Sequence, residues 1–200
     1  MEYLIKNIND IFYNEQILLT IRKDKRNHIN NIKNINAQKR AITGELLLIK
    51  GLKDFYKINY KNIIIKTNMY GKPYISNKKY QNIYFNISHS HDFAICAFSN
   101  KKIGVDIEKI REVNIQIINT IATNKEKEYI LSNKKLIYER LFTIFTLKEA
   151  YFKKIGSNLN NLKSVEFNIN NNSITCSDSS VEIIINTEIE GYIIAFCQDI

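Results

Sequence analysis

The stretch from Phe85 to Lys109 restricts the fold of this chain more than any other part of its sequence. An apolar run is followed by a polar turn at residues 99–102 and then by Ile-Gly-Val-Asp-Ile-Glu at residues 103–108. The last segment alternates apolar residues with Gly, Asp and Glu, which is the two-residue period of a half-buried β-strand. Asp106 and Glu108 are therefore expected on one face of a strand, roughly 7 Å apart.

These two carboxylates are a candidate cation site. Neighbouring negative charges repel each other, so a cation or a proton between them is favoured. Hard oxygen ligands suit Mg²⁺, whose usual partner in proteins is a phosphate group. A lone Asp-x-Glu pair is more often an ordinary solvated strand face, so the metal hypothesis depends on the other motifs of the chain.

The composition predicts a globular protein with an anionic partner. The chain has 200 residues, enough for one large or two small domains, and 44% of them are hydrophobic. The formal net charge of +9 suits nucleic acid, a phosphorylated cofactor or an acidic protein. The same charge also has a compositional explanation, because the chain is rich in Lys, Asn and Ile.

The cysteines and the lack of long apolar segments indicate the compartment. Cys96, Cys176 and Cys197 are far apart, which argues against a disulfide framework or a zinc site and favours a reducing environment. No apolar run approaches the roughly 20 residues of a membrane span, and the N-terminus lacks the apolar region of a signal peptide. We therefore expect a cytoplasmic protein without membrane association.

Two segments have the periodicity of helices. One extends from Ile29 to about Gly51, and the other extends from Leu136 to Ile155 and is followed by a glycine that favours termination. The remaining apolar segments are short and alternating, and turns such as residues 170–172 suit antiparallel hairpins. The predicted fold class is therefore α+β with mainly antiparallel sheets.

Three further features present charged side chains at defined places, and the first of them could hold a phosphate group. Residues 22–39 are strongly basic, with Asp24 as their one acidic residue. Pro73 forces Lys72 into an extended conformation and so fixes where its ammonium group is presented. Glu149 and Lys153 lie four residues apart on one helical face. Each of these features alone is more often structural, as a solvated face or a surface ion pair.

Four motifs in a fixed order add up to a family pattern. They are Gly71-Lys72-Pro73, Phe85-Asn86-Ile87-Ser88-His89-Ser90, Ile103-Gly104-Val105-Asp106-Ile107-Glu108, and the segment from Phe145 to Lys153. Their order and their spacings of about 15, 18 and 40 residues resemble the 4'-phosphopantetheinyl transferases, and among them the one-chain, pseudo-dimeric Sfp type. The resemblance is closest over residues 71–156 and extends approximately over residues 22–50.

The resemblance implies a fold of two similar α/β subdomains. Residues 1–100 would form the subdomain that binds coenzyme A, and residues 101–200 would form the subdomain with the metal site and the catalytic helix. The active cleft would lie between them in one functional unit, and a monomer is expected.

The resemblance also implies a metal-assisted phosphoryl transfer. In this family coenzyme A is bound with Mg²⁺ on its pyrophosphate, and a serine of an acyl or peptidyl carrier protein attacks the β-phosphate. Phosphopantetheine passes to the serine, and adenosine 3',5'-bisphosphate leaves. Asp106, Glu108 and Glu149 match the metal ligands, with Mn²⁺ as an alternative to Mg²⁺. The expected catalytic residues are Asp106, Glu149 as general base, and Lys153 as a phosphate contact.

Six residues match family positions that contact coenzyme A. They are Lys25, His28, Lys72, Pro73, Ser88 and His89. His89 is expected at the 3'-phosphate. The alignment of the basic segment leaves a one-residue slip open, so Lys23, Arg26 or Arg40 could substitute there.

Two positions depart from the family pattern. Phe145 stands in place of the usual Trp, and Ala41 stands where a hydroxyl group is common. Neither change affects the carboxylates, so we expect an active enzyme with weaker binding of coenzyme A.

Two other function classes are open. A nucleic-acid-binding module could use residues 22–40, but these basic residues are not interleaved with aromatic ones and no known reader motif occurs, which makes nucleic acid the less favoured partner. A metal-dependent phosphohydrolase could use Asp106 and Glu108. The sequence does not decide between a fatty-acid carrier and a secondary-metabolite synthetase as partner.

Overall fold

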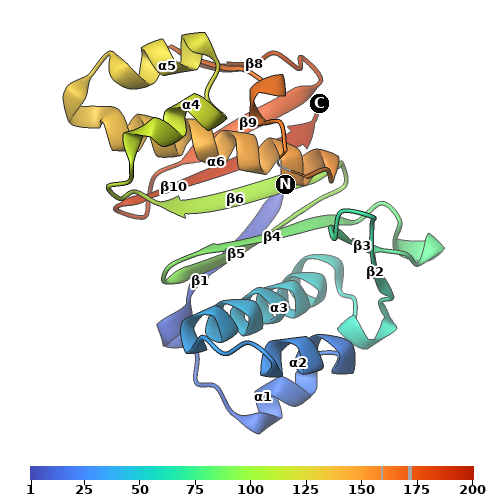
Figure 1. Cartoon of the computed structure of the whole chain (residues 1–200). Helices are drawn as coiled ribbons and strands as arrows, with labels where there is room; N and C mark the ends of the chain where they lie inside the picture. Colours follow the sequence, from blue (N-terminus) through green and yellow to red (C-terminus); the bar gives the residue numbers. More distant parts are fainter. Residues whose placement is uncertain (159, 171–172) are drawn as a thin grey trace.

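The computed structural model describes residues 1–158, 160–170 and 173–200. Within these ranges, two three-stranded antiparallel sheets and two long helices form the frame of the molecule (Figure 1). The first sheet has the order β1-β5-β4, and its strands are β1 (Glu2–Asn7), β5 (Phe93–Ser99) and β4 (Tyr84–Ser90). The second sheet has the order β6-β10-β9, and its strands are β6 (Ile103–Lys109), β10 (Tyr192–Asp199) and β9 (Val181–Asn186).

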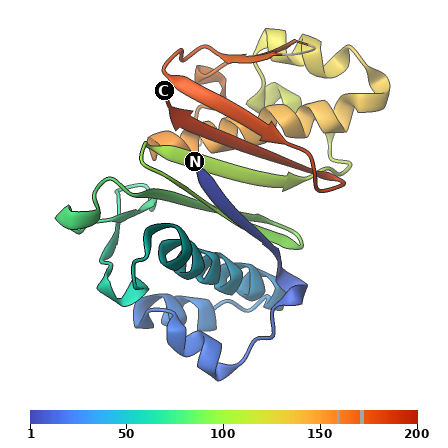
Figure 2. The same ribbon diagram turned by 180° about the vertical axis from the view of Figure 1, so that it is seen from behind.

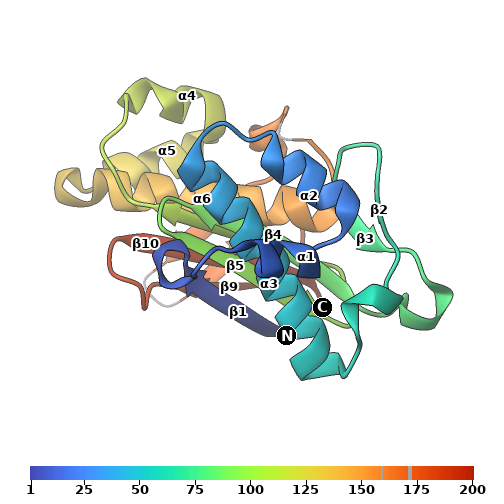
Figure 3. The same ribbon diagram turned by 90° about the horizontal axis from the view of Figure 1, so that it is seen from below.

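The two long helices are α3 (Ile35–Tyr56) and α6 (Ile137–Ile155). The shorter elements are α1 (Glu15–Thr20), α2 (Lys23–Asn30), α4 (Ile118–Ile121), α5 (Asn124–Leu131), and the strand pairs β2 (Ile65–Thr67) with β3 (Pro73–Ile75) and β7 (Phe167–Asn170) with β8 (Ser173–Cys176). Figure 3 shows α1 and α2 gathered around α3, on the outer side of the first sheet.

The molecule is layered as α3, first sheet, second sheet and α6 (Figures 1 and 2). The inner faces of the two sheets meet in one apolar core. Its buried members are Ile95, Ala97, Ile103, Val105, Ile107, Tyr192, Ile194 and Phe196. Each long helix then covers the outer face of one sheet, because its apolar stripe must be removed from water.

Strand β5 is buried on both of its faces. Ala94, Cys96 and Phe98 belong to the core beneath α3, whereas Ile95 and Ala97 belong to the core between the sheets. A strand covered on both sides has no solvated face, so its sequence is continuously apolar rather than alternating. This position explains the apolar run that precedes the turn at residues 99–102.

The prediction of one helix ending near Gly51 was wrong. The segment forms two helices, and α3 continues past Gly51 to Tyr56, where Lys57 adopts a left-handed backbone conformation with φ of 56°. A Cβ atom at Gly51 would lie 2.2 Å from the ring of Phe98. The glycine therefore permits close packing of α3 on β5 and does not terminate the helix.

Other predictions of local structure were confirmed. Helix α6 ends at Ile155, and Gly156 follows it with a positive φ of 70°. The α+β class with antiparallel sheets is also as predicted. The predicted turn at residues 170–172 includes Asn171 and Asn172, which lie outside the described residues. None of the described helices is long and apolar enough to cross a membrane.

Candidate active site

Strands β4 and β6 lie side by side where the two sheets meet, and short polar side chains of β4 join them. Three alternate residues of β4, beginning at Asn86, each accept a hydrogen bond from a backbone amide of β6. The pairs are Val105 N to Asn86 Oδ1 (2.9 Å), Ile107 N to Ser88 Oγ (3.4 Å) and Lys109 N to Ser90 Oγ (3.3 Å). The Asn-x-Ser-x-Ser pattern of β4 therefore fixes the position of the strand that carries the paired carboxylates.

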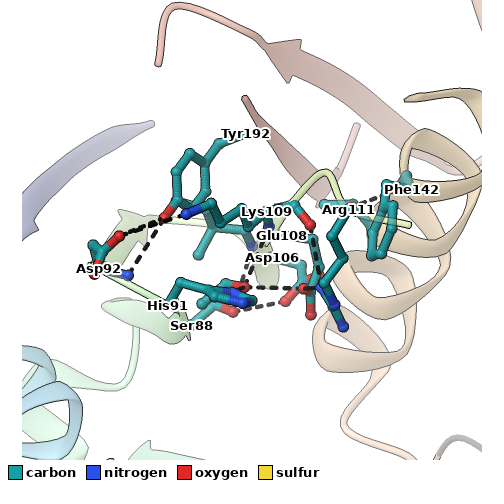
Figure 4. Close-up of polar contacts among 12 residues, drawn as sticks. Ser88, His91, Asp92, Asp106, Glu108, Lys109, Arg111, Phe142 and Tyr192 are labelled. Atoms are coloured by element: carbon teal, nitrogen blue, oxygen red, sulfur yellow. Dashed lines mark hydrogen bonds and ion pairs between the residues drawn. The ribbon is translucent and has the colours of Figure 1, made fainter. Parts of the chain in front are cut away.

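Asp106 is the most buried carboxylate of this region, with 2% of the residue exposed. Its Oδ1 atom accepts hydrogen bonds from Ser88 Oγ and from Lys153 Nζ, both at 2.6 Å. Lys153 Nζ also donates to Ser88 Oγ at 2.9 Å. Oδ2 of Asp106 is buried and has no hydrogen-bond partner among the described residues. Figure 4 shows Ser88 beside Asp106, with Glu108 and Arg111 next to them.

The two other carboxylates face the same region. Glu108 accepts a hydrogen bond from Ser90 Oγ (3.0 Å) and lies 3.4 Å from Arg111 Nη1. Glu149 lies on α6, with its Oε2 atom 4.0 Å from Lys153 Nζ. Burial raises the pKa of Glu149 to about 7, and the negative charge of Asp106 adds to the shift while Lys153 opposes it.

Burial also raises the pKa of Glu108, again with a contribution from Asp106. The three carboxylates predicted from the sequence are therefore close enough to influence one another. Across the described residues, however, no three His, Cys, Asp or Glu side chains form a ready-made metal cage. Positive charge reaches the carboxylates from Lys153, which lies beside Asp106 and Glu149, and from Arg111, which lies beside Glu108.

Gly104 allows α6 to approach β6 closely enough to bring these groups together. A Cβ atom at this position would lie 2.0 Å from the carbonyl oxygen of Ala150 and 2.3 Å from the amide nitrogen of Lys154. Both of these are backbone atoms, so they could not move without displacing the helix. The prediction of a half-buried strand was therefore wrong in its burial, because α6 covers the face of β6 that carries Gly104 and Asp106, and both residues are buried.

A second group of predicted residues lines a cleft of about 210 Å³ in the N-terminal half of the chain. Its lining residues are Lys25, His28, Ile29, Arg40, Ala41, Gly44, Glu45, Pro73, Ile87 and His89. Four of the six predicted coenzyme A contacts thus gather at one place. Arg40 and His89 also line the adjoining recess, which contains Glu108, and so connect the basic cleft to the carboxylates.

Comparison with known protein families agrees with this arrangement. Residues 13–101 match the family model described as 4'-phosphopantetheinyl transferase, N-terminal, and residues 102–197 match the model of the 4'-phosphopantetheinyl transferase superfamily. The chain belongs to the 4'-phosphopantetheinyl transferase superfamily.

Curated relatives include two bacterial 4'-phosphopantetheinyl transferases. The chain is 35% identical to gsp of Aneurinibacillus migulanus over 142 residues, which cover 70% of this chain and 57% of gsp. It is 28% identical to Sfp of Bacillus subtilis over 147 residues, which cover 73% of this chain and 65% of Sfp. The chain thus spans less than two thirds of the length of these relatives. A solved structure of holo-[acyl-carrier-protein] synthase from Thermotoga maritima aligns with a TM-score of 0.42 and 23% identity over 49% of this chain and 62% of the synthase.

The two remaining members of the predicted coenzyme A set lie elsewhere in this member of the superfamily. Ser88 Oγ is engaged by Asp106 and Lys153, as described above. Lys72 Nζ donates to the carbonyl oxygens of Ile103 (3.2 Å) and Lys154 (2.8 Å), and its side chain therefore bridges the two halves of the chain. Contacts of Ser88 and Lys72 with coenzyme A stay predictions.

The structure shows where the two residues that depart from the family pattern lie. Phe145 packs partly buried against the core that surrounds α6, and Ala41 lines the basic cleft. The roles of Ser90 and Arg111 as partners of Glu108 were not predicted. The two-residue spacing of Ser90 from Ser88 was the signal for the first, whereas Arg111 belongs to the irregular segment after β6, which no motif covers.

Proposed function

We propose that this protein transfers 4'-phosphopantetheine from coenzyme A to a serine of an acyl or peptidyl carrier protein. The serine Oγ forms a bond to the β-phosphorus of coenzyme A, and the bond from that phosphorus to the bridging oxygen breaks. Adenosine 3',5'-bisphosphate leaves with the bridging oxygen, and the serine proton passes to a carboxylate of the site. The observation that carries the proposal is the continuity, through Arg40 and His89, of the basic cleft with the recess that contains Glu108, one of the three carboxylates.

The carboxylates fit the Mg²⁺ that this chemistry needs. The buried Oδ2 atom of Asp106 lacks a hydrogen-bond partner among the described residues, and such an atom is costly unless a cation or donor reaches it. Asp106, Glu108 and Glu149 would hold the ion through hard oxygen atoms, which suit Mg²⁺ and also Mn²⁺. When bound, the ion supplies positive charge that offsets the charge on the transferred phosphoryl group.

The residues of the chain take distinct roles in this proposal. Glu149 accepts the serine proton, because it is the carboxylate that α6 presents beside Asp106 and Glu108. Lys153 provides a compact positive charge for a phosphate oxygen. Ser88 and Ser90 orient Asp106 and Glu108 through the hydrogen bonds described above.

The basic cleft would bind the adenosine end of coenzyme A. Lys25, His28 and His89 offer charge and hydrogen bonds to the 3'-phosphate, and Pro73 provides an apolar wall. Glu45 lies 3.9 Å from Lys25 Nζ and orients that ammonium group. All of these residues come from one chain, so we expect the protein to act as a monomer. Its net charge of +9 suits an acidic carrier domain.

The test is intact-mass spectrometry of an apo carrier protein incubated with this protein, coenzyme A and Mg²⁺. We expect a mass gain equal to one phosphopantetheine group, and we expect EDTA to prevent it. Asp106→Ala should lower the rate by about 100-fold or more while leaving the fold intact, because the cation would lose its most buried ligand.

Asp54→Ala is the matched control, since Asp54 is an aspartate of α3 that pairs with Lys50 far from the carboxylates. It should leave transfer unchanged. Near-normal transfer by the Asp106→Ala variant would contradict the metal assignment. A protein that neither binds coenzyme A nor modifies any of several carriers would contradict the proposed function.

A further inference from the structure

Lys148 immediately precedes Glu149 on α6, and its ammonium group lies inside the core of the C-terminal half. Lys148 and Glu126 are 0% and 1% exposed. Lys148 Nζ lies 2.8 Å from Glu126 Oε2 and donates to the carbonyl oxygens of Leu162 and Val165, each at 2.7 Å. Three acceptors therefore take the three protons of the ammonium group.

Glu126 is equally well satisfied. Its Oε2 atom also accepts a hydrogen bond from the amide of Thr123 (2.7 Å), and its Oε1 atom accepts one from the amide of Phe167 (2.8 Å). Glu126 belongs to the first turn of α5, where Thr123 caps the helix. The pair thus connects α6 to the start of α5 and to the segment 162–167.

Stability alone does not explain an ion pair at this place. The surroundings are apolar, and two well-packed hydrophobic residues in place of a buried ion pair are often as stable or more stable. Burial lowers the pKa of Lys148, and the charge of Glu126 opposes that shift. What an ion pair adds over apolar packing is direction, because its hydrogen bonds are satisfied in only one rotation of the helix about its axis.

That rotation decides where Glu149 lies. Successive residues of an α-helix are separated by about 100° around its axis, so a fixed Lys148 fixes the direction of Glu149. Lys148 faces α5 and the core, whereas Glu149 faces Asp106 and Glu108 of strand β6. A rotation or slide of α6 would move Glu149 away from these two carboxylates.

The geometry points to Glu126 and Lys148 as positioning residues, which hold α6 in the rotation that places Glu149 in the carboxylate cluster. The inference rests on the proposed transfer reaction, in which Glu149 acts. Neither residue touches coenzyme A or the reacting atoms in this role, and both act through Glu149.

Two variants test the inference. Glu126→Asp keeps the charge but shortens the side chain by one methylene group, so the pair can form only if α6 shifts. The double variant Glu126→Gln, Lys148→Met removes both charges and leaves no unpaired ion in the core. Lys125→Met is the matched control, because Lys125 adjoins Glu126 on α5 and forms a 3.2 Å ion pair with Glu166, but its side chain is 74% exposed.

Two readouts separate a positioning role from a merely structural one. The first is the affinity for Mn²⁺, measured by electron paramagnetic resonance with saturating coenzyme A and no carrier protein. The second is the separation of kcat from KM for coenzyme A in the transfer assay. Far-UV circular dichroism and urea unfolding establish that each variant is folded.

We expect both variants to fold, to bind Mn²⁺ about tenfold more weakly and to lose about tenfold in kcat, as is typical when the partner of a metal ligand is disturbed. KM for coenzyme A should change less than twofold, because the basic cleft is untouched. The Lys125→Met control should match the wild type in every readout.

Folded variants with native Mn²⁺ affinity and native kcat would overturn the inference and leave the proposed function standing. Loss of folding in both variants would also overturn it, because the pair would then be a requirement for the fold rather than for the placement of Glu149. A wild-type protein that neither transfers phosphopantetheine nor binds Mn²⁺ would overturn the proposed function, and this inference with it.

Discussion

Lys72 caps the C-terminal end of α6 from the other half of the chain. Its ammonium group donates to the carbonyl of Lys154 in the last turn of α6, where carbonyls lack partners within the helix and carry partial negative charge. Burial lowers the pKa of Lys72 from 10.5 to about 8, with Lys102 and Lys154 adding to the shift and Asp199 opposing it. Lys72, which its motif predicts as a coenzyme A contact, therefore also contacts the last turn of α6.

This pKa predicts how stability depends on pH. Between pH 8 and pH 10.5 the unfolded chain retains the proton of Lys72 while the folded chain releases it, so the contribution of Lys72 to the free energy of unfolding rises with pH across this window. The difference in unfolding free energy between wild type and Lys72→Met should therefore increase by roughly 1–3 kcal/mol from pH 7.5 to pH 10.5. Urea unfolding at several pH values measures it.

The control for this experiment is Lys66→Met, which changes an exposed lysine of the neighbouring strand β2. Its difference from the wild type should stay constant over the same range. A constant difference for Lys72→Met as well would show that burial does not lower the pKa of Lys72 in the folded protein.

At the level of elements, the sequence predicts what depends on local pattern and misses what depends on a distant partner. The strand β6 and the end of α6 at Gly156 are local features, and both were predicted correctly, but the burial of β6 on both faces was not. Gly51 was misread as a helix end, because its role depends on Phe98 in a strand more than forty residues away. The polar face of β6 was expected to meet solvent in the simplest reading, since only the fold reveals that α6 covers it.

In the candidate site, too, local motifs were predicted and contacts between distant residues were not. The motifs identified the three carboxylates and the basic cleft by resemblance, and the structure brings their members near one another. The bonds of Lys72 and the buried partner of Lys148 could not be predicted, because each joins residues that are remote in the sequence and share no motif.

The contact of α6 with β6 supplies a prediction at this scale. Gly104→Ala would place a methyl group against backbone atoms of α6, so the helix must move outward. We expect a loss of roughly 1–3 kcal/mol in the free energy of unfolding, as for other overpacked cores. Transfer should fall more than the loss of stability explains, because Glu149 moves with the helix. Urea unfolding and the initial rate of transfer measure the two effects.

Gly191→Ala is the comparison for Gly104→Ala. Gly191 has a positive φ of 75° but has open space around the position of a Cβ atom. Its substitution should cost about 1 kcal/mol from backbone strain and leave transfer by the folded protein unchanged. Equal loss of transfer in both variants would show that reduced stability, and not displacement of α6, explains the effect at Gly104.

For the whole molecule, the core between the two sheets decides whether the halves fold separately. The division into residues 1–100 and 101–200 predicts two subdomains that form one functional unit. Phe196 of the second sheet is 2% exposed, and the ring of Tyr3 from the first sheet lies 5.1 Å from it, centroid to centroid. Strand β5 contributes to this shared core with one face and to the core of the N-terminal half with the other. Neither half can be opened without exposing the apolar face of the other.

We therefore expect the chain to unfold in a single cooperative transition. Hydrogen exchange followed by mass spectrometry in increasing urea should expose peptides of α3 and of α6 at the same midpoint. Phe196→Ala should lower the free energy of unfolding by about 3–5 kcal/mol, as for other buried aromatic residues, and should shift both midpoints equally. Phe12→Ala is the control, because Phe12 is 80% exposed, and it should shift neither. Separate midpoints for α3 and α6 would mean that the halves fold independently and that the core between the two sheets does not couple them.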